Sequence, residues 1–201
     1  ILWLVGMSNA FNLADIMDGL ASGLGVIAAT FLLVVALLNG RWVVAAFTVA
    51  LIGALLGFLK SNFYPATIYL GDCGSLFIGL TLGALAMVMD YTTYNPLGWL
   101  APLYILAVPL IDTAYVIVLR LKSGRKVYYG SPDHFPLRVR KTLDGWTAGT
   151  VVVSYAVAVV FGALGLVILF LDPMSTMILT AVVGVVTLGL LVWLATVPME
   201  A

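Results

Sequence analysis

The sequence predicts an all-α protein, a polytopic bundle of transmembrane helices. Hydrophobic residues make up 63% of its 201 residues, compared with roughly 45–50% in soluble domains. Charged residues make up 9%, compared with about 25% in soluble domains. Since so apolar a chain cannot cover its core with polar surface, its solvent must be lipid.

Apolar stretches of roughly membrane-spanning length recur along the whole chain. A helix needs about 20 apolar residues to cross a bilayer. Six stretches meet or nearly meet this length: 20–38, 41–59, 75–89, 99–121, 147–171 and 175–197. Residues 1–7 read as the end of a seventh span, and the chain opens without Met and without the charged start of a signal peptide. We therefore expect 1–201 to be a single integral membrane domain, the C-terminal part of a larger protein.

The basic residues predict which connections share a side of the membrane. Seven of the nine Lys and Arg fall at the end of the fourth stretch or in the connection that follows it: Arg120, Lys122, Arg125, Lys126, Arg138, Arg140 and Lys141. The positive-inside rule places this connection, 122–146, in the cytoplasm. Counting spans from it puts connections 8–19 and 60–74 on the same side.

The charge balance and the cysteine content exclude several classes of function. Nine Lys and Arg balance nine Asp and Glu, so no basic excess indicates nucleic acid as a partner. Cys73 is the single cysteine, which excludes an internal disulfide framework and a multi-cysteine metal site. The functions that remain belong in or at the membrane.

Acidic residues gather on the predicted cytoplasmic side. Five of them lie in its connections: Asp15, Asp18, Asp72, Asp133 and Asp144. Asp112 lies inside the fourth stretch, about two helical turns from its cytoplasmic end. Carboxylates within a membrane are costly and are functional candidates by default. The cluster predicts a polar site at the inner membrane surface.

The first polar segment, 8–19, carries two amides and two acids at every third position. These residues are Asn9, Asn12, Asp15 and Asp18. On a helix such positions drift slowly around one face, and on a 3₁₀ turn they align. Between apolar stretches they can face only a polar cavity or the membrane interface. The alternative is a solvated loop that leads into the next helix, in which both Asn side chains would be idle.

The second segment places an acid between two glycines where the third stretch begins. Gly71 and Gly74 flank Asp72 and permit unusual dihedrals and close approach of a ligand. Carboxylates from two connections on one face would suit Mg²⁺, which binds one or two carboxylates plus substrate phosphates. An ordinary helix N-cap is the alternative role for Asp72.

The third segment is the basic loop that contains His134, the single histidine. Its default interpretation is positive-inside topology with attraction to anionic lipid. Phosphate recognition is the sharper alternative, because Arg neutralises diphosphates well. In an extended loop between Pro132 and Pro136, Arg138 and Arg140 would share a side and present both guanidiniums to a diphosphate. His134 would lie beside them as a hydrogen-bond donor.

The ordered motifs of these segments match one known family. They are N-x-x-N-L-x-D-x-x-D-G from residue 9, N-x-x-P-A from residue 62, G-D-x-G-S-L-F from residue 71 and P-x-x-D-T from residue 109. Together they resemble the polyprenyl-phosphate N-acetylhexosamine-1-phosphate transferases. This family includes the bacterial UDP-GlcNAc:undecaprenyl-phosphate transferases and the phospho-N-acetylmuramoyl-pentapeptide translocase.

The resemblance implies an activity, a cofactor and a set of site residues. The implied reaction transfers a sugar 1-phosphate from a UDP-sugar to polyprenyl phosphate and releases UMP, which would initiate synthesis of a cell-envelope polysaccharide. The implied metal is Mg²⁺, with Mn²⁺ as an alternative, on Asp72 with Asp15 as a second carboxylate. The candidate catalytic residues are Asp15, Asp18, Asp72 and His134. The candidate substrate-binding residues are Asn9, Asn12, Asn62, Tyr69, Arg138 and Arg140, of which Asn62 and Tyr69 correspond to uracil contacts.

This chain departs from the family pattern in two places. Members have about ten spans, and an acidic pair proposed to contact the lipid phosphate or to act as base precedes the region matched here. The basic loop keeps Pro132-Asp133 and the His134-Phe135 pair but lacks most of the family's histidines, and Arg138 and Arg140 are candidates to replace them. The sugar therefore stays open between N-acetylhexosamine 1-phosphate and the phospho-MurNAc-pentapeptide alternative.

Two other classes of function compete with the enzyme. A transporter or lipid flippase would favour broken helices with charges at the membrane midplane, whereas here the polar residues concentrate on one face. A purely structural membrane subunit leaves five acids on one side unexplained. We expect a multi-pass protein of the bacterial inner membrane whose site faces the cytoplasm, with the lipid bilayer as a partner and a homodimer left open.

Overall fold

The computed structural model describes residues 1–124 and 133–199, and its regular elements in these ranges are all helices. The elements in chain order are α1 (Leu2–Ala14), α2 (Leu20–Leu38), α3 (Trp42–Asn62), α4 (Gly71–Met87), the 3₁₀ turn η1 (Gly98–Leu100), α5 (Ala101–Ile105), α6 (Ala107–Lys122), α7 (Phe135–Thr142), α8 (Thr147–Ile168) and α9 (Pro173–Ala195). The predicted all-α class is confirmed.

Each of the six predicted stretches is helical, but not every stretch forms a single helix of full membrane-spanning length. Within the described residues, α2, α3, α8 and α9 are each long and apolar enough to cross a membrane. The third stretch is α4, an apolar helix of 17 residues. The seventh, partial span is α1, of 13 residues.

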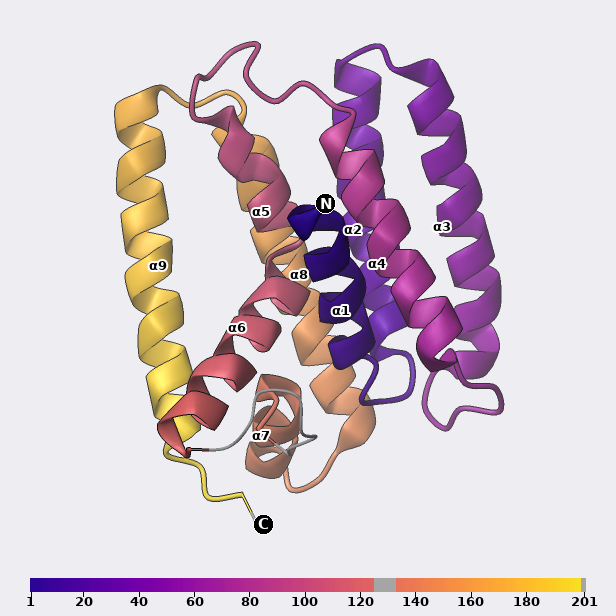
Figure 1. The fold of residues 1–201 in the computed structure, drawn as a ribbon, viewed down its shortest axis with the longest axis vertical. Coiled ribbons are helices and arrows are strands. Elements are labelled where there is room, and N and C mark those ends of the chain that lie inside the picture. Colours follow the sequence, from indigo (N-terminus) through magenta and orange to yellow (C-terminus); the bar gives the residue numbers. More distant parts are fainter. Residues whose placement is uncertain (125–132, 200–201) are drawn as a thin grey trace.

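The prediction of one continuous span over 99–121 is wrong. The segment Gly98–Ile105 meets α6 at an angle of 75°, and the break lies at Leu106. Pro109 explains this break, because its ring lacks an N–H and collides with the carbonyl four residues earlier, here that of Ile105. The bend directs α6 toward the lower end of α9 (Figure 1).

The helix α1 packs against both α4 and α6 and lies between them in the view of Figure 1. Its contact with α4 is close because α4 carries glycine there: a Cβ on Gly79 would lie 2.3 Å from the carbonyl oxygen of Met7. Trp3 adds a hydrogen bond from its indole N–H to the Gly83 carbonyl at 3.0 Å. This packing fixes the first polar segment against the second.

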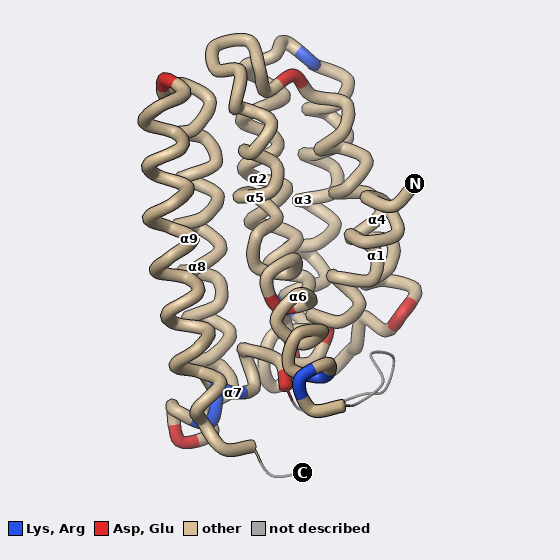
Figure 2. Tube along the Cα trace, turned by 60° about the vertical axis from the view of Figure 1, so that its left-hand side comes forward, with Lys and Arg blue, Asp and Glu red and all other residues tan. Residues whose placement is uncertain are grey.

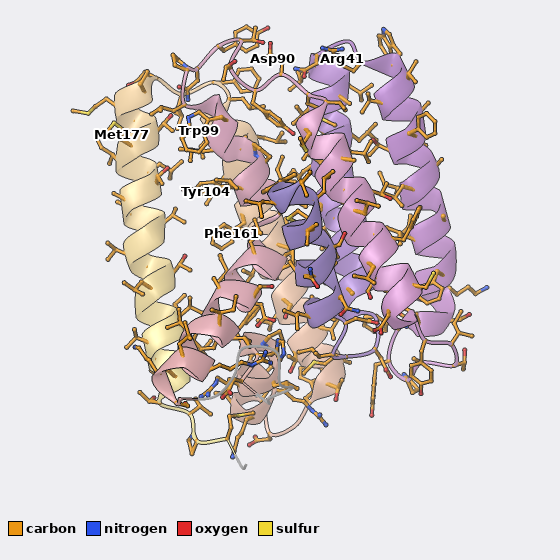
Figure 3. The ribbon with its side chains drawn as sticks, in the orientation of Figure 1. Arg41, Asp90, Trp99, Tyr104, Phe161 and Met177 are labelled. Atoms are coloured by element: carbon orange, nitrogen blue, oxygen red, sulfur yellow. The ribbon has the colours of Figure 1, made fainter. Side chains whose placement is uncertain are left out.

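The connections separate into two groups at opposite ends of the bundle. The turn 15–19, the loop 63–70 and α7 lie at one end, here called the α7 end (Figure 1). Arg41 and Asp90 lie at the other end (Figure 3), and charged residues concentrate near the two ends (Figure 2). The predicted grouping of connections is therefore present in the fold, with one correction: residues 8–14 belong to α1 and are not a loop.

Candidate active site

The first two polar segments meet where α1 ends and α4 begins. Asn12 donates through its Nδ2 to Asp72 Oδ1 and to Ser75 Oγ, both at 3.0 Å. Ser75 is fully buried and its hydroxyl donates to the Gly71 carbonyl at 3.0 Å. The amide of Asn12 therefore sets the position of the Asp72 carboxylate, and Ser75 supports this contact from within α4.

Asp72 lies in the first turn of α4 and is exposed. The N-cap residue of this helix is Leu70, without a side-chain capping bond, so the simple N-cap role for Asp72 is wrong. Segment 71–75 is the first turn of the helix, and Gly71 adopts a φ of +65°, one of the unusual dihedrals that the flanking glycines permit. An anionic residue in the first turn is favoured by the helix dipole, which keeps the carboxylate available beside Asn12.

Asp15 adds a second carboxylate at the end of α1. It is half-buried, and burial together with the negative charges of Asp72 and Asp18 raises the pKa of its carboxyl from 3.8 to about 6. Asp15 is therefore close enough to Asp72 and to Asp18 for the negative charge of each to repel its own. A cation placed among them would relieve this repulsion.

Asp18 holds two connections together. Its Oδ2 accepts a hydrogen bond from the Ala66 N–H at 3.0 Å, which links turn 15–19 to loop 63–70. The next residue, Gly19, has φ +77°, and its carbonyl accepts hydrogen bonds from the hydroxyls of Ser22 and Tyr155. Tyr155 lies on α8, far from every motif, and sequence reasoning missed it.

The two candidate uracil contacts differ in their availability. The Tyr69 ring is 76% exposed, so it can receive a base. Asn62 is buried: its Oδ1 accepts from the Ser22 hydroxyl at 2.7 Å and its Nδ2 donates to the Ile68 carbonyl at 3.0 Å. In this structure Asn62 therefore shapes the loop that carries Tyr69, and its contact with uracil stays a prediction.

Asn9 lies one turn before Asn12 on α1 and is exposed. Its Nδ2 donates to the Val5 carbonyl at 2.9 Å, within its own helix. The structure thus brings together Asn12, Asp15 and Asp72, while Asn9 lies on the neighbouring turn.

A buried pair joins α6 to the start of α7. Asp112 and His134 are 2% and 4% exposed, and Asp112 Oδ2 lies 2.6 Å from His134 Nδ1. The other carboxylate oxygen, Oδ1, accepts the Phe135 N–H at 2.8 Å. The intramembrane acid singled out in the sequence is therefore the partner of the single histidine.

The extended arrangement predicted for Arg138 and Arg140 is wrong, because both residues lie on α7. Pro136 is accommodated in the first turn of this helix, where a missing N–H costs nothing. Arg140 is exposed and donates through Nε to the Gly145 carbonyl at 3.1 Å. Since residues two apart on a helix point in different directions, the two guanidiniums do not share a side.

Arg138 contacts the end of the last helix. It is 6% exposed, and it donates to the carbonyls of Leu194, Ala195 and Val197 and to the Asp133 carboxylate. A cation at the C-terminus of a helix satisfies its free carbonyls and its dipole. In this structure the side chain of Arg138 therefore joins α7 to α9.

The comparisons with known proteins agree with the motifs. Residues 1–90, which contain the Asn12–Asp72 contact, match the sequence model of Glycosyl transferase family 4. The matched segment, residues 1–90, is called the family 4 region below. The resemblance inferred from the motifs is confirmed.

Curated relatives of two kinds share this similarity. A probable undecaprenyl-phosphate N-acetylglucosaminyl 1-phosphate transferase of Bacillus subtilis (strain 168) is 34% identical over 169 residues, which are 84% of this chain and 47% of the relative. A phospho-N-acetylmuramoyl-pentapeptide-transferase of Limosilactobacillus fermentum is 36% identical over 170 residues, or 80% of this chain and 51% of the relative. A protein of the same name from Listeria monocytogenes is 36% identical over 159 residues, or 77% and 46%. The chain spans about half the length of these relatives.

The carboxylates of the family 4 region fit a divalent cation that takes only a few of its ligands from the protein. Within the described residues, no group of three His, Cys, Asp or Glu side chains is arranged to hold a metal. Mg²⁺ does not require such a group, because it retains waters and binds one or two carboxylates plus substrate phosphates. Exposed Asp72 and the raised pKa of Asp15 match this chemistry.

Proposed function

We propose that the protein to which this chain belongs transfers a sugar 1-phosphate from a UDP-sugar to polyprenyl phosphate and releases UMP. The observation that carries this proposal is the Asn12–Asp72 contact within the family 4 region. It unites an amide and an acid from two motifs separated in the chain, with Asp15 beside them. Such a cluster binds and orients a metal–diphosphate substrate.

The chemistry requires an acceptor phosphate oxygen to attack the phosphorus that carries the sugar. The bond from this phosphorus to the bridging oxygen then breaks, and UMP leaves. Because two anions must approach, catalysis depends on positioning and on charge neutralisation. A bound Mg²⁺ would supply that neutralisation, held by Asp72 with Asp15, while Asn12 orients Asp72.

The exposed ring of Tyr69 is proposed to stack on uracil. Loop 63–70 carries this ring, and it is held by Asp18 through the Ala66 N–H and by Asn62 through the Ile68 carbonyl. Asp18 and Asn62 thus contribute to nucleotide binding by positioning the loop. A direct contact of Asn62 with the base is a further part of the proposal.

An apolar groove between α6 and α9 supports a polyprenyl acceptor. Its volume is about 570 Å³, and Tyr104 and Phe161 lie side by side at one part of its wall, with ring centroids 6.0 Å apart (Figure 3). Lys122, at the last residue of α6, lines the groove near the α7 end. An isoprenoid chain would lie in the apolar part with its phosphate toward this end.

The names of the relatives favour two donor sugars. One relative is named for N-acetylglucosaminyl 1-phosphate and two for phospho-N-acetylmuramoyl-pentapeptide. Since UDP-sugars are cytoplasmic, we propose that the α7 end faces the cytoplasm and that the protein resides in the bacterial inner membrane. This orientation follows the positive-inside rule.

The test is nucleotide exchange by the full-length protein in detergent. Radiolabelled UMP should enter UDP-GlcNAc or UDP-MurNAc-pentapeptide only when polyprenyl phosphate and Mg²⁺ are both present. Incorporation with one donor identifies the sugar. Absence of exchange with both donors, together with movement of labelled substrate across reconstituted vesicles, would support a transporter and overturn the proposal.

A further inference from the structure

We propose that Asp112 is a positioning residue that keeps the ring proton of His134 on Nδ1 and leaves Nε2 to meet the acceptor phosphate. This inference rests on the proposed function and on His134 as the candidate catalytic residue that the family resemblance implies. It assigns a role to an intramembrane carboxylate that the motifs only located. The role is that of an orienting acid, which acts on the substrate solely through His134.

The geometry commits both oxygens of Asp112. Its Oδ2 lies 2.6 Å from His134 Nδ1, and its Oδ1 accepts from the Phe135 N–H at 2.8 Å. A backbone N–H can only donate, and an ionised carboxylate can only accept. The carboxylate therefore takes two donors, which places a hydrogen on Nδ1 of the histidine.

The burial of the pair makes this assignment strict. Asp112 and His134 are 2% and 4% exposed, so water is largely excluded from the contact between Oδ2 and Nδ1, and these two atoms depend on each other. The pair also crosses between two elements, since Asp112 lies on α6 and His134 immediately precedes α7. The carboxylate thus orients the imidazole ring as well as selecting its tautomer.

With the proton on Nδ1, the neutral ring offers Nε2 as an acceptor. As the acceptor phosphate attacks, any proton it still carries can pass to Nε2, and the carboxylate stabilises the imidazolium that forms. The proton then leaves to solvent or to the departing UMP. This role differs from the hydrogen-bond donor expected for His134 from the sequence.

Asp112→Asn separates this role from simple tethering. The asparagine has one acceptor oxygen and one donor group, and the Phe135 N–H must take the oxygen. The NH₂ group then faces Nδ1, which must become an acceptor, so the proton moves to Nε2. The variant keeps the size of the side chain and the link to α7, but it inverts the tautomer.

The first measurement is kinetic, on the full-length protein. We expect Asp112→Asn to lower kcat about 100-fold with the KM for the UDP-sugar changed less than about twofold. Thr113→Val is the matched control, because the adjacent hydroxyl is buried on the same helix and has no partner among the described residues. This control should retain its kcat.

A double-mutant cycle tests whether Asp112 acts through His134. In a His134→Gln background, Asp112→Asn should cause little additional loss of kcat, since the ring it orients is gone. Losses that multiply in the double variant would assign Asp112 a separate structural role and overturn the inference.

Nitrogen NMR of histidine-labelled protein gives a readout independent of turnover. The His134 signals, assigned by their loss in His134→Gln, should show protonated Nδ1 in the wild type and protonated Nε2 in Asp112→Asn. The same tautomer in both proteins would overturn the inference. If the wild-type protein performs no UMP exchange, the proposed function fails, while the NMR result still decides whether Asp112 selects the tautomer.

Discussion

Asn12 and Asp72, 60 residues apart in the chain, are joined by a hydrogen bond of 3.0 Å across the α1–α4 interface. The two helices can approach each other this closely because Gly79 of α4 leaves room for the backbone of Met7 in α1. The relative position of the two proposed metal-binding segments therefore depends on helix packing as well as on their own sequences.

We expect Asp72→Asn in the full-length protein to lower kcat about 100- to 1,000-fold, because a neutral amide binds Mg²⁺ weakly and leaves the diphosphate charge uncompensated. The measurement is UMP exchange over a range of Mg²⁺ concentrations. Asp90→Asn is the control, since Asp90 is an exposed acid at the opposite end (Figure 3). Near-normal turnover of Asp72→Asn would remove Asp72 from the metal site.

Tyr69→Ala should raise the KM for the UDP-sugar about tenfold, in line with the stacking energy of a base on an aromatic ring. The effect on kcat should be smaller, since the stacking is equal in ground and transition states. Tyr94→Ala is a matched control, because Tyr94 is 70% exposed and its ring stacks on Phe170 instead. A lower kcat with an unchanged KM would contradict the stacking role.

Arg138→Lys should destabilise the protein by about 1–3 kcal/mol, because an ammonium cannot reach Asp133 and the three carbonyls at and just beyond the end of α9 at the same time. Arg140→Lys should change stability by less than about 0.5 kcal/mol, since Arg140 is exposed. Thermal unfolding of the full-length protein measures both effects. If Arg138→Lys instead leaves the melting temperature unchanged and weakens UDP-sugar binding, the phosphate role inferred from the sequence is correct.

The pKa of Asp15 predicts how stability depends on pH. Its value rises from 3.8 to about 6 in the folded protein, so the folded state favours the protonated carboxyl. Stability from this group is present at low pH and is lost as the pH rises from about 4 to about 6. Without divalent cations, Asp15→Asn should therefore raise the melting temperature relative to wild type more at pH 7 than at pH 4.

Asp172 provides a control of opposite sign for this experiment. It caps α9 through the N–H groups of Met174 and Ser175. A hydrogen bond from the Ser175 side chain, together with these backbone hydrogen bonds, lowers the pKa of its carboxyl. Stability from Asp172 is present at neutral pH and is lost on acidification. An Asp15→Asn effect that is equal at pH 4 and pH 7 would show that Asp15 ionises in the folded state as it does in the unfolded chain.

Much of the site could be predicted because its residues lie in short segments, each of which is recognisable from its own sequence. Asn12, Asp15 and Asp18 recur at regular spacing between apolar stretches, and Asp72 follows a glycine at the start of a helix. Local composition is sufficient to locate such segments. The break at Leu106 was missed although Pro109 signals it, because the overall apolarity of 99–121 favoured one continuous span.

Other features could not be predicted because they join segments distant in the sequence. Tyr155 reaches Gly19 across 136 residues, and Arg138 reaches Leu194 across 56. Nothing in the neighbourhood of either residue distinguishes a side chain that packs against another helix from one that faces lipid or solvent. An arginine that binds phosphate and an arginine that caps a helix both donate to several acceptors at once, so the residue type does not distinguish the two roles.

The sequence by itself determined that this chain is helical, that it belongs with lipid, and that its acids gather between the apolar stretches. These properties follow from composition and from spacing along the chain. Only the tertiary structure decided which acid meets which partner: Asp72 with Asn12, and Asp112 with His134. The reason is that a carboxylate accepts from any donor within reach, and the packing of α1 on α4 and of α7 beneath α6 determines which donor that is.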